Sequence, residues 1–93
     1  MSSINLDSIL KKHPQVRYTI VPEGGLLVLH ESAELMTLNP IAIEIFDKID
    51  GKKKVKELLK EILKEYDVEE EKAREDIFEF LKELEEKEII EVL

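Results

Sequence analysis

Between residues 15 and 38, short apolar runs alternate with breaks, as is typical of β-strands joined by tight turns. The run QVRYTIV is rich in β-branched and aromatic residues, and the runs LLVLHE and ELMTL follow it. The segment Pro22–Gly25 is a strong turn signal, and Ser32-Ala33 is a weaker break. This pattern predicts three short strands in an antiparallel meander.

After the third strand, the apolar residues recur at intervals of three and four, which predicts helices. Asn39 is a suitable N-cap and Pro40 a suitable first helical residue, so the first helix is expected to begin at this corner. Gly51 can adopt the left-handed conformation that ends a helix. The corner therefore predicts a sharp change from strand to helix.

Two further helices are expected, from about Lys54 to Tyr66 and from Asp67–Glu69 to about Lys87. Asp67 and Glu70 have the spacing of a capping box at the start of the last helix. Three strands followed by three helices predict an α+β domain, with a three-stranded antiparallel sheet packed on three helices in a winged-helix-like layout.

The two ends of the chain have weaker patterns. Residues 1–14 are expected to form an N-terminal extension, either a frayed tail or a short helix that ends at Pro14. Residues 15–93 are expected to form one domain, because a chain of 93 residues is too short for two. The final IIEVL is expected to be a short extended segment or a docked tail.

The composition narrows the classes of function. The absence of Cys excludes disulfides and thiolate metal sites, and it fits the reducing cytoplasm. No signal peptide or membrane span is visible in the sequence. The net charge of −8 opposes binding to nucleic acid, which requires cationic surface.

A helix–turn–helix with β-strands is also an arrangement found in DNA-binding proteins, and the last helix would then be the recognition helix. However, residues 69–88 carry ten acidic and four basic side chains, so the phosphate backbone would repel this helix. The arrangement of elements is compatible with DNA binding, but the negative charge of the last helix opposes it.

The sequence contains few residues that could act in catalysis or bind a metal ion. His13 and His30 stand far apart without Cys, and the abundant carboxylates fall on helix faces that must be solvated in any case. Ser32 has no evident orienting partner, and no glycine-rich phosphate loop is present. We therefore expect no catalysis, no metal and no cofactor.

The class of function that remains is binding of a protein or peptide. A meander has two edge strands, and an exposed edge is either protected from pairing with another chain or used for such pairing. One use is strand addition, in which an extended peptide pairs with the backbone of the edge strand. The alternative is that charged side chains simply protect both edges.

The order of short motifs from residue 15 to about residue 91 resembles the PqqD-like family, the small proteins of pyrroloquinoline quinone biosynthesis. The motifs are LN at 38–39, the helix with Ala42, Ile45 and Phe46, then DG at 50–51, VKEL at 55–58, EYDV at 65–68, and DIFEFL at 76–81 with Leu84. Two positions depart from the family pattern. Lys54 stands where a Thr or Ser cap is frequent, and Glu88 stands where Gly is common.

The resemblance implies a non-catalytic module that binds the leader segment of a ribosomally made precursor peptide. The leader would lie as an added strand against the third strand, beside the third helix, and be presented to a modifying enzyme, often a radical S-adenosylmethionine enzyme. The alternative is a winged-helix regulator or scaffold that contacts other proteins. The protein would be a monomer, or a weak homodimer through its edge strands.

On this basis the expected peptide-binding residues come from the third strand and the third helix. They are Glu34, Leu35, Met36, Thr37, Arg74, Phe78, Leu81 and Lys82. Phe78 is included because it lies beside the main apolar stripe of its helix rather than within it. The alternative for Phe78 is that it wraps the edge of the core.

Overall fold

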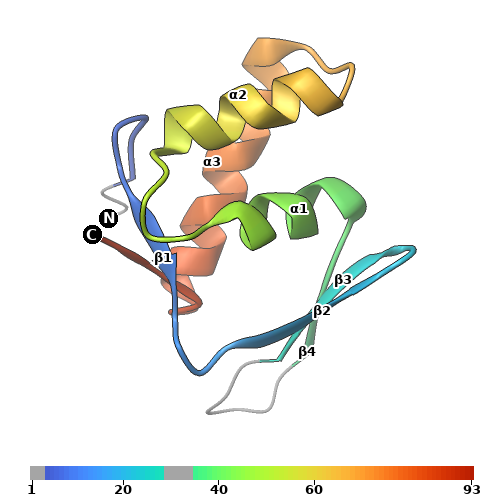
Figure 1. Ribbon diagram of the computed structural model, residues 1–93, viewed down its shortest axis with the longest axis vertical. Coiled ribbons are helices and arrows are strands. Elements are labelled where there is room, and N and C mark those ends of the chain that lie inside the picture. Colours follow the sequence, from blue (N-terminus) through green and yellow to red (C-terminus); the bar gives the residue numbers. More distant parts are fainter. Residues whose placement is uncertain (1–3, 29–34) are drawn as a thin grey trace.

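The computed structural model describes residues 4–28 and 35–93, and Figure 1 shows helices stacked on one side of a small sheet. The elements are, in order, β1 (Leu10–Lys12), β2 (Arg17–Val21), β3 (Gly24–Val28), β4 (Leu35–Leu38), α1 (Pro40–Lys48), α2 (Val55–Glu65), α3 (Glu70–Glu86) and β5 (Ile90–Val92). The predicted α+β class, with a three-stranded antiparallel sheet and three helices, is confirmed. A second, two-stranded sheet of β1 and β5 was not predicted.

The three-stranded sheet has β3 at its centre, with β2 and β4 paired to it in antiparallel register. Tyr18, Leu27 and Met36 stand opposite one another across the three strands, so they share one face of the sheet. Leu27 has no exposed surface, which identifies this face as the one that the helices cover. The tight turn is shorter than predicted, because Gly24 and Gly25 already belong to β3.

Part of the predicted meander lies outside the described residues. This applies to the continuation of the middle strand through His30, to the break at Ser32-Ala33, and to the start of the third strand at Glu34.

The corner after β4 forms as predicted. The Asn39 side-chain oxygen accepts a hydrogen bond from the Ala42 amide at 2.8 Å, and Pro40 is the first residue of α1. Ile43, Ile45 and Phe46 form the buried face of this helix. The N-cap therefore fixes the point at which the strand stops and the helix leaves the sheet.

The last helix begins without the predicted capping box. The N-cap is Glu69, which makes no side-chain capping bond, and Asp67 lies in the linker that precedes it. The prediction of a cap at Asp67 was wrong because the helix starts two residues later than that motif requires. At its other end, Glu88 has a φ of 59°, so this position adopts the left-handed conformation that explains why Gly is common there.

Residues 10–12 belong to the segment that was expected to form a frayed tail or a short helix, and they form neither. They form strand β1, which pairs with β5 at the opposite end of the sequence. Its backbone is also tied to the loop after α1, because the Gly51 amide donates to the Leu10 carbonyl at 2.8 Å. The strand is stabilised by partners distant in sequence, so three residues of local pattern could not reveal it.

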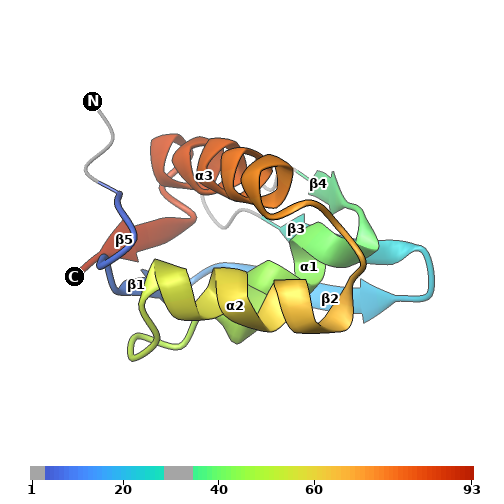
Figure 2. The ribbon, with the colours of Figure 1, turned by 90° about the horizontal axis from the view of Figure 1, so that it is seen from above.

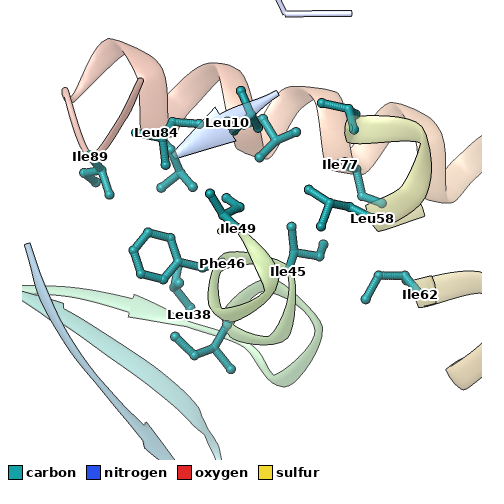
Figure 3. Close-up of a cluster of buried hydrophobic side chains, with 14 of the residues drawn as sticks. Leu10, Leu38, Ile45, Phe46, Ile49, Leu58, Ile62, Ile77, Leu84 and Ile89 are labelled. Atoms are coloured by element: carbon teal, nitrogen blue, oxygen red, sulfur yellow. The ribbon is translucent and has the colours of Figure 1, made fainter. Parts of the chain in front are cut away.

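One apolar core lies between the sheet and the helices. Figure 3 shows side chains from α1, α2, α3 and β1 meeting in it, and Phe46 has no exposed surface. Leu10 is 1% exposed and belongs to the same cluster. In the part of the chain that the structure describes, no helix has the length and apolar character needed to cross a membrane.

We expect Leu10→Ala to lower the free energy of unfolding by about 2–5 kcal/mol, because it removes a buried side chain from the core. Urea unfolding followed by circular dichroism measures this loss. The matched control is Leu93→Ala, which removes a side chain that is 65% exposed at the end of the same small sheet. The control should change stability by no more than about 0.5 kcal/mol. Equal unfolding midpoints for Leu10→Ala and the parent would contradict the docking of β1.

Candidate functional site

Strand β4 is an edge of the three-stranded sheet. It pairs with β3 on one side, and no other strand of the described residues pairs with it. Met36 packs against the core and Leu38 is buried, whereas Leu35 is 65% exposed on the opposite face. Alternate backbone amides and carbonyls of an edge strand point away from its partner, so β4 presents hydrogen-bonding groups outward.

A hollow of about 230 Å³ lies where β4 turns into α1 and faces α3. Its lining is mostly apolar and comprises Asn39, Ile41, Ala42, Ile45, Ile62, Val68, Lys72, Ala73, Asp76, Ile77 and Phe80. Figure 2 shows that β4 is the strand on the α3 side of the sheet and that β2 is on the far side. The open edge and the hollow are therefore neighbours.

The charged groups of this hollow come from α3. Lys72 Nζ lies 3.2 Å from Asp76 Oδ1, and both side chains are more than half exposed. The hydrogen bond to Asp76 raises the pKa of Lys72, and the nearby carboxylates of Asp76, Glu75 and Glu79 raise it further. Lys72 therefore stays charged and compensates Asp76.

The other edge of the sheet, β2, borders a different hollow of about 270 Å³ against α1. The exposed Ile20 lies in its lining, together with the carboxylates Glu44 and Asp47. Asp47 is already engaged, because the Tyr18 hydroxyl donates to its Oδ1 at 2.6 Å and the Lys12 ammonium donates to its carbonyl at 3.0 Å. The β2 edge thus lies beside polar side chains that already bond to one another, whereas the β4 edge lies beside an apolar hollow.

The predicted site residues divide into three groups. Leu35, Met36 and Thr37 lie together on the β4 edge, and Glu34 lies outside the described residues. Leu81 is fully buried, so its side chain supports the core and is not available at a surface.

The remaining predicted residues share one side of α3, because Arg74, Phe78 and Lys82 follow one another at intervals of four. Arg74 lines a separate hollow of about 600 Å³, between α3, α2 and the N-terminal Leu6. The structure therefore does not bring Arg74 to β4. Phe78 packs against the core on that same side.

The sequence analysis missed Ile41, Asp76 and Phe80, which line the hollow next to β4. Phe80 lies beside the buried stripe of Ile77, Leu81 and Leu84 and is only half-buried. Phe78 and Phe80 flank this stripe on opposite sides of the helix, since residues two apart are separated by about 200°. The sequence analysis named only Phe78 as a flanking residue, and the sequence alone does not say which flank faces the hollow next to β4.

The arrangement offers backbone hydrogen bonds and an apolar recess rather than reactive groups. Among residues 4–28 and 35–93, no group of three or more His, Cys, Asp or Glu side chains is placed to hold a metal ion. What the site can do chemically is bind an extended chain along β4 and receive its side chains in the hollow.

Comparison with known proteins identifies the family and the fold. The family model described as Coenzyme PQQ synthesis protein D (PqqD) matches residues 25–90, which is most of the chain. No curated protein matches. Two solved structures share the fold at 22% sequence identity.

The first is TbiB1 in complex with the TbiA(beta) leader peptide, with a TM-score of 0.77 over 87% of this chain and 94% of that one. The second is a lasso peptide synthetase B1 complexed with the leader peptide, with a TM-score of 0.75 over 88% of this chain and 96% of that one. At this level of identity the likeness establishes a shared fold.

Proposed function

The chain belongs to the PqqD family, and from this premise we propose that it captures the leader segment of a ribosomally made precursor peptide and presents it to a modifying enzyme. The observation that carries the proposal is the open β4 edge beside an apolar hollow. Both similar structures described above are complexes with a leader peptide, which supports the same function for this fold.

The mode of binding would be strand addition. The backbone of an extended leader pairs with the outward amides and carbonyls of β4, which gives affinity without regard to side chains. Successive side chains of a strand point to opposite faces, so every second leader residue can face the hollow. In this mode, the backbone hydrogen bonds provide affinity for the peptide, and the hollow provides selectivity for its side chains.

The β4 edge is rigid enough for this role. Four residue pairs join it to β3, from Val28–Leu35 to Gly25–Leu38. Its last residue, Leu38, is 8% exposed, and the capped start of α1 follows directly. A strand that is already ordered loses little conformational entropy when the peptide adds to it.

The partner enzyme is the second part of the proposal. The PqqD-like resemblance implies a radical S-adenosylmethionine enzyme, acting in the cytoplasm on the peptide that this protein presents. The protein itself would contribute no catalysis, metal or cofactor, and it would act as a monomer or a weak homodimer. Pull-down of the candidate enzyme, with and without the precursor peptide, tests this partnership.

Proline substitutions test strand addition directly, because proline removes a backbone amide. Met36 and Thr37 are adjacent, so one amide points toward β3 and the other away from it. We expect one of Met36→Pro and Thr37→Pro to unfold the protein. The other should remain folded and lose about fivefold or more in affinity for peptide, since a main-chain hydrogen bond contributes about 1 kcal/mol.

The measurements are circular dichroism for folding and fluorescence polarisation for binding. The probe is a peptide isolated on the parent protein from a displayed library of random linear sequences, called the selected peptide from here on. Met36→Ala and Thr37→Ala are the controls, because they change the side chain and keep the amide. If both proline variants fold and bind like the parent, strand addition at β4 is wrong.

A second experiment distinguishes the two flanks of α3. We expect Phe80→Ala to lower affinity for the selected peptide by about tenfold or more, because Phe80 lines the hollow next to β4. Phe78→Ala, the matched control, should bind within about twofold of the parent despite a similar loss of stability. The opposite result would place the peptide on the Arg74 side of the helix, where the sequence first suggested it.

A further inference from the structure

The linker between α2 and α3 forms part of the wall of the hollow next to β4. It spans residues 66–69, between the last residue of α2 and the first residue of α3. Of these four residues, Val68 lines the hollow, and its side chain is 39% exposed. The other apolar residues of the lining belong to α1, α2 and α3. Val68 is therefore the apolar wall residue whose position depends on a short linker rather than on a helix.

Tyr66 connects this linker to two other walls of the hollow. Its amide donates to the Ile62 carbonyl of α2 at 2.9 Å, and its carbonyl accepts from the Val68 amide at 3.1 Å. Its hydroxyl donates to Oε2 of Glu44 on α1 at 2.5 Å. Both Ile62 and Ile45, the residue after Glu44, line the hollow. Tyr66 thus joins the linker to α1 and α2 from behind the hollow.

The bond between Tyr66 and Glu44 has a neutral donor and an ionised acceptor. Hydrogen bonds with Glu65 and with Tyr66 lower the pKa of Glu44, so this carboxyl is charged at neutral pH. The hydrogen bond to Glu44 raises the pKa of Tyr66, so the hydroxyl keeps its proton. Hydrogen bonds to an ionised acceptor are stronger than those between neutral groups. The contact is therefore suited to hold the linker against α1.

We propose that Tyr66 is a positioning residue that determines, through Val68, which peptide side chains the hollow accepts. This inference rests on the proposed function and adds a determinant of its specificity. With the hydroxyl bonded to Glu44, the wall is ordered before the peptide arrives. Without this bond the linker must be ordered on binding, and the cost falls on peptide side chains that enter the hollow. Backbone pairing along β4 involves the strand rather than the linker, so it is unaffected.

The test compares the selected peptide with an analogue in which one residue is replaced by Ala. That residue is the one whose replacement is most strongly coupled to Phe80→Ala in a double-mutant cycle, which identifies it as the occupant of the hollow. We expect the parent to bind the selected peptide about tenfold more tightly than the analogue. Tyr66→Phe should reduce this ratio to about threefold or less, by weakening the selected peptide and leaving the analogue within about twofold.

The matched control is Tyr18→Phe. It removes a hydroxyl that donates to another carboxylate of α1, Asp47, at 2.6 Å, on the β2 side of the sheet. Tyr18→Phe should keep the parent ratio. Glu44→Ala should reproduce the effect of Tyr66→Phe, and it carries the same test if Tyr66→Phe does not fold. Glu44→Gln retains an acceptor for the hydroxyl and should keep most of the ratio.

A second cycle distinguishes positioning from a general effect on stability. If Tyr66 acts through Val68, Val68→Ala lowers the ratio, and adding Tyr66→Phe lowers it no further. Additive effects of the two changes, equal weakening of both peptides by Tyr66→Phe, or an unchanged ratio would overturn the positioning role and leave strand addition intact. Failure of the parent to enrich any peptide from the library would overturn the proposed function and this inference together.

Discussion

The close approach of α1 to the sheet at Gly25 is the contact on which the rest of the architecture depends. A Cβ atom at this position would lie 2.2 Å from Cγ1 of Ile43, so the helix sits where only glycine leaves room. At the neighbouring Gly24, a Cβ would lie 2.0 Å from the Leu38 carbonyl oxygen. The end of β4 and the first turn of α1 are thus pressed onto the β2–β3 hairpin, and this contact fixes both the last paired residue of β4 and the place where α1 begins.

This constraint explains why a corner without reactive residues can be central to function. The Asn39 cap and Pro40 turn the chain directly from β4 into α1, so β4 stays short, ordered and open along one edge. The same turn places Ile41 in the lining of the hollow, which Phe80 also lines. If recognition runs through the backbone of β4, the corner needs shape and rigidity rather than chemistry, and the caps provide both.

The sequence predicted the features that depend on neighbouring residues, such as the three helices, the corner and the order of the meander. It did not predict β1, whose partners are the distant β5 and the loop at Gly51. It placed Phe78 in the binding site and did not name Phe80, which lines the hollow next to β4, because the side of α3 that faces this hollow depends on how the helix is rotated against its neighbours. It also placed Leu81 in the site, although the structure buries that side chain in the core.

The rotation of α3 is itself held by elements distant from the hollow. The left-handed turn at Glu88 leads directly into β5, and the Ile89 amide closes the helix by donating to the Leu84 carbonyl at 2.9 Å. Strand β1 then pairs with β5, and from β1 the Lys12 ammonium reaches the Asp47 carbonyl of α1 at 3.0 Å. The strand β1 lies outside residues 25–90, which the family model matches, yet it links the far end of α3 to α1. The shape of the hollow between α1, α2 and α3 depends on how these helices are held together, and the β1–β5 sheet links the far end of α3 to α1.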